Sequence, residues 1–173
     1  MFRSLHMKLM LILLLLITSL MAVVGAFLTT SVSSFYIDTF YQQMNSVFGV
    51  DQREFMSDLR SAAAAENGAE QIRDMLDTNA GSLGIDYRTR NYFVLDGYTG
   101  SYITGSADQA ALPREQTVNL LTARNAVSNG DETTAGANSD ITADYMDVAV
   151  PIQRGDDHYV IYIYDNKATA NDL

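Results

Sequence analysis

The sequence predicts an α+β protein: an N-terminal transmembrane helix that continues into a long helix, then a domain of about five antiparallel strands with flanking helices. Three observations predict this class. A long apolar run stands near the N-terminus, and apolar residues at helical spacing follow it up to about residue 79. Aromatic and β-branched segments separated by turn residues then occupy much of the second half.

The first element is the apolar run. No charged residue occurs from Leu9 to Ile37, and the segment from Leu9 to Leu28 has 20 residues. As a helix, this segment rises about 30 Å, which is the thickness of the hydrocarbon layer of a bilayer. We therefore expect one membrane span.

The charges that flank the run predict its orientation. Arg3 and Lys8 precede it, and no Lys or Arg follows until Arg53. Because short cytoplasmic flanks are rich in Lys and Arg, we expect the N-terminus in the cytoplasm. The predicted regions are a cytoplasmic N-terminus at 1–8, a transmembrane helix at 9–30 and an extracytoplasmic domain at 31–173.

A cleaved signal peptide is the alternative interpretation of the run. Basic residues precede it, and Val24-Gly25-Ala26 offers small residues at a cleavage position. However, the run is about twice the length of a usual signal-peptide core, and helix-compatible sequence continues past it. These features favour an uncleaved anchor.

The segment from Ser31 to Phe48 is predicted to be a helix that continues the anchor. Its apolar residues recur at spacings of three and four and form one stripe. They are Phe35, Ile37, Phe40, Tyr41, Met44, Val47 and Phe48. The stripe packs on its own domain, forms a homodimer seam along a signalling helix, or is wide enough to do both.

Four further helical segments are predicted from capping residues and strong helix formers. They are Asp51 to Glu66, Ala69 to Asn79, a helix within Ala110 to Val127 that begins at the latest at Arg114, and the first turns of a helix in Asp165 to Leu173. Pro113 suits the first turn of the third helix, and Asp165 or Asn166 suits the cap of the last.

The strands are predicted from two-residue alternation and turn residues. Asn91 to Asp96 and Ser101 to Thr104 flank the turn Gly97-Tyr98-Thr99-Gly100 and form a hairpin. Tyr145 to Ile152 and Tyr159 to Tyr164 form a second antiparallel pair. The polar segment from Ser128 to Ala143 is either a mobile loop or a weak edge strand.

The apolar pattern of each strand predicts its place in the sheet. The segments around residues 91–96 and 159–164 are apolar on both faces and belong in the middle of a covered sheet. The segment at 145–152 has one more polar face, and Pro151 suits it to an edge. The first and last strands are therefore expected side by side at the centre.

Composition excludes several function classes. Of the 21 acidic and 11 basic residues, all the acidic ones and nine of the basic ones follow the anchor, so this part repels nucleic acid. The chain has no cysteine, which excludes disulfides, thiolate catalysis and zinc sites built on cysteine. A cysteine-free exported domain is more typical of bacteria than of small eukaryotic secreted scaffolds.

Three segments in this order carry a resemblance to a known family. They are the hairpin Val94-Leu95-Asp96-Gly97-Tyr98-Thr99-Gly100, the strand end Ala149-Val150-Pro151-Ile152 and the last strand Tyr162-Ile163-Tyr164-Asp165 that leads into a helix. The region from Ser31 to Leu173 resembles the extracytoplasmic PAS-like sensor domain, of the PDC or single Cache type, of bacterial sensor histidine kinases. The first 30 residues resemble the first transmembrane segment of such receptors.

The resemblance implies a dimeric receptor with a second membrane span, a HAMP linker and a kinase core. Residues 1–173 contain no second apolar run, no phosphoacceptor His-Glu motif and no Gly-rich ATP lid. The expectation is a fragment of a histidine kinase, or else a stand-alone anchored protein of the cell envelope. A chemoreceptor or a diguanylate cyclase with this sensor is the alternative within the same class.

The residues carry no pattern that predicts catalysis. His158 adjoins Asp156 and Asp157 on a turn, where neighbouring side chains point apart, and no P-loop, HExxH or GxSxG motif occurs. Neither a metal nor a cofactor is expected. The resemblance implies a ligand on the sheet face beneath a helix, for a small molecule or a protein outside the cell. The candidate lining residues are Tyr92, Tyr102, Arg124, Tyr145 and Asp147; ordinary half-buried tyrosines and a paired Arg124 are the alternative.

Overall fold

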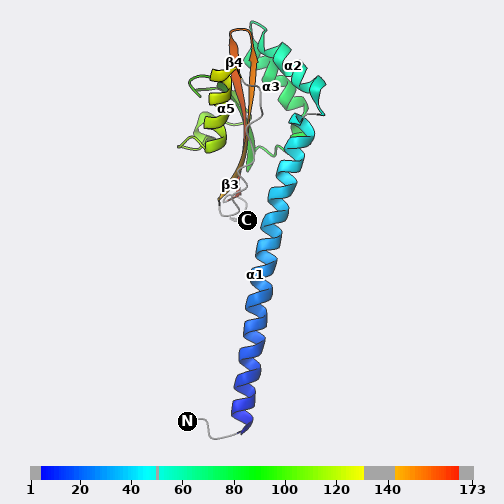
Figure 1. The fold of residues 1–173 in the computed structure, drawn as a ribbon, viewed down its shortest axis with the longest axis vertical. Coiled ribbons are helices and arrows are strands. Elements are labelled where there is room, and N and C mark those ends of the chain that lie inside the picture. Colours follow the sequence, from blue (N-terminus) through cyan, green and yellow to red (C-terminus); the bar gives the residue numbers. More distant parts are fainter. Residues whose placement is uncertain (1–4, 50, 131–142, 168–173) are drawn as a thin grey trace. The chain divides into compact units, whose positions relative to one another are not determined.

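The computed structural model describes residues 5–49, 51–130 and 143–167. Figure 1 shows the chain as a ribbon. The chain divides into two compact units, Met1–Asp38 and Thr39–Leu173. The predicted boundaries at residues 8 and 30 concern exposure to lipid, so they stay predictions.

The described elements follow the predicted order of helices, a hairpin, a helix and then two strands. They are α1 Leu5–Phe48, α2 Arg53–Ala63, α3 Gly68–Thr78, α4 Ala80–Leu83, β1 Arg90–Asp96, β2 Tyr102–Gly105, the 3-10 turn Gln109–Ala111, α5 Val118–Asn129, β3 Tyr145–Arg154 and β4 Asp157–Asn166. The α+β class is confirmed, with a long apolar N-terminal helix and then an antiparallel sheet with helices.

Helix α1 is long and apolar enough to cross a membrane, and no other helix of the described residues meets both conditions. Its apolar window lies fully exposed in the structure. Hydroxyl groups within this part donate to carbonyl oxygens of the preceding turn: Thr18 to Leu14 at 3.0 Å, Thr29 to Gly25 at 3.0 Å and Thr30 to Ala26 at 3.0 Å. A hydroxyl satisfied in this way can enter lipid without an unpaired donor.

The sheet has the strand order β2-β1-β4-β3, and every pair of neighbours is antiparallel. Strands β1 and β4 lie side by side at the centre, with Phe93 opposite Tyr162. Strand β3 lies at one edge. The predicted central pair and the predicted edge strand are therefore confirmed, because strands that are apolar on both faces need cover on both sides.

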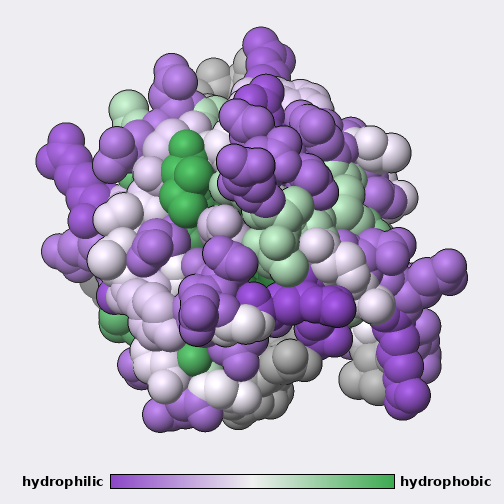
Figure 2. All heavy atoms as spheres, turned by 90° about the horizontal axis from the view of Figure 1, so that it is seen from above, coloured by the Kyte–Doolittle hydropathy of each residue, from purple (hydrophilic) through white to green (hydrophobic). Residues whose placement is uncertain are grey.

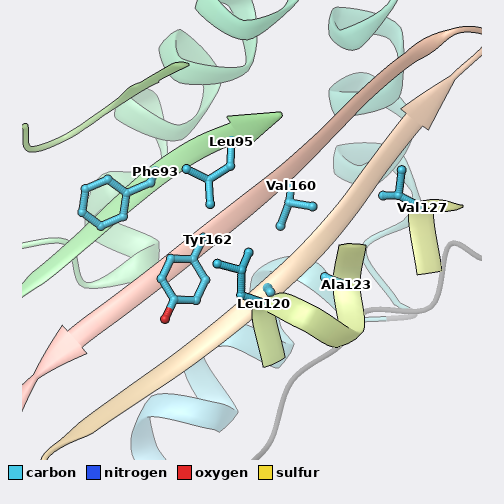
Figure 3. Packing of buried hydrophobic residues seen from close by; sticks show 8 residues of the cluster. Phe93, Leu95, Leu120, Ala123, Val127, Val160 and Tyr162 are labelled. Atoms are coloured by element: carbon cyan, nitrogen blue, oxygen red, sulfur yellow. The ribbon is translucent and has the colours of Figure 1, made fainter. Parts of the chain in front are cut away.

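Helices cover both faces of the sheet, as Figure 1 shows. Helix α5 lies on one face, where its residues Leu120, Ala123 and Val127 meet strand side chains, among them Phe93 and Tyr162 (Figure 3). Helices α2 and α3 lie on the opposite face. Figure 2 shows a face of the molecule covered mainly by hydrophilic residues, as expected for a part that meets water.

Several sequence expectations need correction. The described residues contain four strands rather than about five, and residues 131–142 of the predicted loop or edge strand lie outside the described ranges. Strand β3 is buried on both faces, because Asp147 and Ala149 lie beneath α5. Helix α5 begins at Val118 and not by Arg114, so Pro113 precedes it.

The end of the last strand also differs from expectation. Asp165 pairs with Arg90 and Asn166 pairs with Tyr145 across the sheet. Because β4 continues through both of them, the expected terminal helix begins no earlier than Lys167. The rest of that predicted helix, from residue 168, lies outside the described residues.

The second unit, Thr39–Leu173, which we call the compact unit, buries part of the apolar stripe of the predicted continuation helix. Phe40, Met44, Val47 and Phe48 are buried in the unit that begins at Thr39. Burial of these four side chains removes them from any contact with a second copy. Packing on its own domain therefore accounts for the second half of the stripe.

A carboxylate organises the turn before β1. Asp86 accepts hydrogen bonds from the backbone N–H groups of Arg88, Thr89 and Arg90 and from the Thr89 hydroxyl, at 2.6 to 2.9 Å. Burial alone would raise the pKa of Asp86, but these hydrogen bonds outweigh it and lower the pKa from 3.8 to about 2.

We expect the Asp86 turn to weaken in acid. A carboxylate with a lower pKa in the folded state stabilises the fold above its unfolded pKa of 3.8, and this contribution is lost as the pH falls toward about 2. Asp86 is exposed, so water screens the effect to about 1 kcal/mol or less. Asp86→Asn should therefore lower the free energy of unfolding at neutral pH and make little difference at pH 2, as measured by urea unfolding. An equal loss at both pH values would contradict this assignment.

Candidate functional site

The face of the sheet beneath α5 carries a row of aromatic side chains. Ring centroids are 5.5 Å apart for Tyr145 and Tyr164, 6.1 Å for Tyr164 and Tyr162, 6.5 Å for Tyr162 and Phe93, and 6.3 Å for Phe93 and Tyr102. The row arises because alternate residues of β1, β3 and β4 share one face in the observed register. It runs from the edge strand β3 to the opposite edge strand β2.

A buried carboxylate lies beside this row. Asp147 is 2% exposed and accepts hydrogen bonds from Thr117 Oγ1 at 2.5 Å and from Tyr162 Oη at 3.1 Å, both on Oδ2. Asn119 Nδ2 donates to Oδ1 at 2.8 Å and to the main-chain oxygen of Asp147 at 3.1 Å. These four residues form the Asp147 network.

Neutral donors hold the carboxylate of the Asp147 network. The donors are two hydroxyls and one amide, each at hydrogen-bond distance. Thr117 also accepts from the N–H of Leu120 at 3.3 Å and caps the N-terminus of α5. The network therefore fastens the first turn of α5 to β3, because a buried carboxylate needs every donor it can reach.

The electrostatic field of Asp147 reaches several tyrosines. Burial, and then the nearby carboxylate, raise the pKa of Tyr162 far above its ordinary value. Burial, followed by Asp147 and Tyr145, raises the pKa of Tyr41 to about 12. Burial is also the first cause of a raised pKa at Tyr164. These phenols stay protonated at physiological pH, and the Tyr162 hydroxyl donates to Asp147 Oδ2.

Three of the five predicted site residues share the α5 face. Tyr145 and Asp147 come from β3, and Tyr102 lies at the far end of the aromatic row, where its hydroxyl donates to Ala107 O at 3.1 Å. Tyr92 points to the opposite face, where its hydroxyl donates to Asp77 Oδ1 of α3 at 2.5 Å. The structure therefore separates Tyr92 from the other tyrosines.

Arg124, the fifth predicted residue, belongs to the hairpin turn rather than to the Asp147 network. Its guanidinium donates to Gln116 Oε1 and to the main-chain oxygen of Tyr98. The same turn is held by Asp96, which accepts from the N–H groups of Tyr98 and Thr99. Arg124 thus ties α5 to the β1–β2 turn.

A second cluster joins the beginning and the end of the compact unit. Arg90 of β1 donates to Asp165 Oδ2 of β4 at 2.7 Å and to Gln43 Oε1 of α1 at 2.7 Å. It also donates to Leu83 O of α4 at 3.2 Å, and its Cζ lies 4.9 Å from the centroid of the Phe40 ring. We call these five residues the Arg90 junction.

The Arg90 junction is mostly shielded from water. The side chains of Arg90 and Asp165 are 15% and 11% exposed. A guanidinium can serve several acceptors in one plane and one aromatic face at once, which a lysine cannot. The single side chain of Arg90 therefore connects segments that are far apart in the sequence.

Sequence reasoning missed most of the residues in these two clusters. Thr117 had a local signal, because a threonine before an apolar turn is a good helix cap. Asn119, Tyr162 and Arg90 had none, since their contacts depend on the strand register and on how the helices pack on the sheet. Among the described residues, no group of three His, Asp or Glu side chains is placed to hold a metal ion.

Comparison with known proteins adds no family to this picture. No family model matches the chain, and neither a curated protein nor a solved structure matches it.

Proposed function

We propose that the chain is the extracytoplasmic signal-input region of a bacterial transmembrane sensor histidine kinase of the two-component type. In this role α1 anchors the region in the cell membrane with its N-terminus in the cytoplasm. A small molecule or a protein binds the compact unit outside. The unit then changes the position or rotation of the helices that lead back to the membrane.

The Arg90 junction is the observation that carries this proposal. A sensor must couple the segment by which the chain enters its domain to the segment by which it leaves. Gln43 and Phe40 belong to the end of α1, and Asp165 stands at the end of β4. Because one largely shielded guanidinium contacts all three, a shift of the sheet would displace both segments.

The sheet order supports a PAS-like interpretation of the compact unit. Its first and last described strands are central neighbours, and its central strands are covered on both faces. The aromatic row and the Asp147 network would lie at the ligand face. Tyr102, Tyr145 and Asp147 are the predicted ligand-binding residues that share that face, while Tyr92 and Arg124 serve other contacts.

The alternatives differ in the domain that is joined to the C-terminal side of this region. A methylated coiled coil would make the protein a chemoreceptor, and a nucleotide cyclase domain would make it a diguanylate cyclase. A gene that ends after Leu173 would favour a stand-alone envelope protein. The downstream reading frame discriminates between them.

The proposal includes a homodimer through the helix from Ser31 to Phe48. Since Phe40, Met44, Val47 and Phe48 are buried, the seam in its second half would use the exposed positions Thr39, Gln42, Asn45 and Ser46. The chain has no cysteine, so a single cysteine at Gln42 tests the seam directly by disulfide cross-linking in membranes.

The proposed conduit is tested by a two-glycine insertion after Ser34 in a receptor that carries this region ahead of a second span and a kinase core. We expect the insertion to abolish the response of autophosphorylation to stimulus, because glycines weaken a helix and two extra residues rotate the rest of the helix by about 200°. The matched control is the same insertion after Gly155, in an exposed turn. An unchanged response after the Ser34 insertion would refute the conduit.

A further inference from the structure

The uncharged part of α1 is longer than a hydrocarbon layer requires. It runs from Leu9 to Ile37, which is 29 residues and about 43 Å of helix. A bilayer with its headgroup regions is about 40–45 Å thick. The run therefore matches the full membrane, and its end coincides with the end of the first compact unit at Asp38.

The last turns of this run present an apolar helix face. Val32, Phe35 and Tyr36 are 52%, 67% and 63% exposed. With Leu28 they recur at the spacing i, i+4, i+7 and i+8, so they prolong one face of the apolar helix beyond the first 20 residues. We call Val32, Phe35 and Tyr36 the outer aromatic face.

The residue types of the outer aromatic face suit the boundary between lipid and water. Tyrosine has an apolar ring and a polar tip, and aromatic residues are enriched at headgroup level. The threonines just before this face, Thr29 and Thr30, donate their hydroxyls to carbonyls of their own helix. These groups can therefore lie in lipid. When the whole 29-residue run fills the membrane with both headgroup regions, the outer aromatic face at its end lies at the outer headgroups.

We propose that the outer aromatic face binds the headgroup region of the outer leaflet and sets the depth of α1 in the membrane. The membrane-embedded helix then extends to Tyr36, six residues beyond the predicted boundary at residue 30, and Tyr36 is not part of a stalk in water. This inference rests on the anchor of the proposed function. Its occupant is lipid rather than a second copy, because the face continues the apolar surface of the span. The homodimer of the proposed function would then use only the second half of its helix, at the exposed positions Thr39, Gln42, Asn45 and Ser46.

The chain contains no tryptophan, so one introduced tryptophan reports its own surroundings. The full chain is reconstituted in vesicles of phosphatidylcholine and phosphatidylglycerol that carry bromine either near the headgroups or near the chain ends. We expect Tyr36→Trp to be quenched most by shallow bromine and to emit at shorter wavelength than Tyr98→Trp. Tyr98 is exposed in the compact unit and should be quenched by aqueous iodide instead.

A second variant measures depth without a fluorophore in the outer aromatic face. A tryptophan in Phe27→Trp reports the depth of the span through its quenching by shallow and by deep bromine. Adding Phe35→Ala and Tyr36→Ala should change the ratio of these two quenching levels relative to Phe27→Trp alone. These side chains are exposed, so the variants keep the buried core intact.

Three outcomes would overturn the inference. Iodide quenching of Tyr36→Trp equal to that of Tyr98→Trp would mean a stalk in water. Protection from both bromine and iodide would mean that a second copy covers the face. An unchanged depth profile of Phe27→Trp would mean that the face does not set the depth. If Phe27→Trp itself is not quenched by either brominated lipid, the anchor fails and the proposed function fails with it.

Discussion

Arg90→Met is expected to lower the free energy of unfolding by about 3–5 kcal/mol, the range for removing one partner of a buried ion pair. The variant leaves the largely buried Asp165 carboxylate without its cation and removes the donors to Gln43 and Leu83 O. Methionine keeps the length of the side chain, so the loss reports the charge and its hydrogen bonds. Urea unfolding of the full chain in detergent, followed by circular dichroism, measures it.

Arg73→Met is the matched control. Arg73 faces Asp77 at 3.6 Å, and these side chains are 49% and 39% exposed, so its loss should cost less than about 1 kcal/mol. The double variant Arg90→Met, Asp165→Leu should recover part of the loss, because an apolar pair replaces an unpaired charge. An equal decrease in the free energy of unfolding for Arg90→Met and Arg73→Met would show that the Arg90 junction does not stabilise the fold.

Asp147→Ala is expected to destabilise the compact unit by about 3–4 kcal/mol, within the range for buried polar groups that lose their partner. The variant leaves the donors of Thr117, Asn119 and Tyr162 buried without their acceptor. It also frees the first turn of α5 from β3. Hydrogen exchange should therefore show faster opening of α5, together with a lower free energy of unfolding.

Two comparison variants should destabilise the compact unit less than Asp147→Ala does. Tyr162→Phe removes one donor and leaves Asp147 with two others, so we expect a loss of about 1 kcal/mol. Asp144→Ala removes an exposed carboxylate a few residues away and should change stability by less than about 0.5 kcal/mol. A loss at Asp147→Ala no larger than that at Asp144→Ala would exclude the Asp147 network as the attachment of α5.

The local sequence pattern was enough to predict the positions of three strands in the sheet. The two-sided apolar runs of β1 and β4 placed both strands at the centre, and Pro151 placed β3 at an edge. The alternation within β3 predicted a one-sided strand because it contains Asp147. Burial of that carboxylate depends on donors from α5 and β4, and no pattern within β3 reports them.

The prediction of the site residues was incomplete for the same reason, because the pattern within one segment does not report contacts between segments. Tyr92 and its neighbours are apolar in both directions, so alternation could not say which face each tyrosine joins. The register of β1 against β4 assigns Tyr92 to α3 and Phe93 to α5. Arg124 lies on α5 as expected, yet a turn far away in the sequence captures its guanidinium.

The amino-acid sequence alone established the long apolar N-terminal helix, the acidic cysteine-free composition, and the described strands with their order from the centre of the sheet to its edge. Those properties depend on hydrophobicity and spacing within a single segment. Only the tertiary structure decided that Asp147 is held by neutral donors and that Arg90 joins α1, α4, β1 and β4. A hydrogen bond acts over about 3 Å, so its partners are known only when the folded chain brings them together.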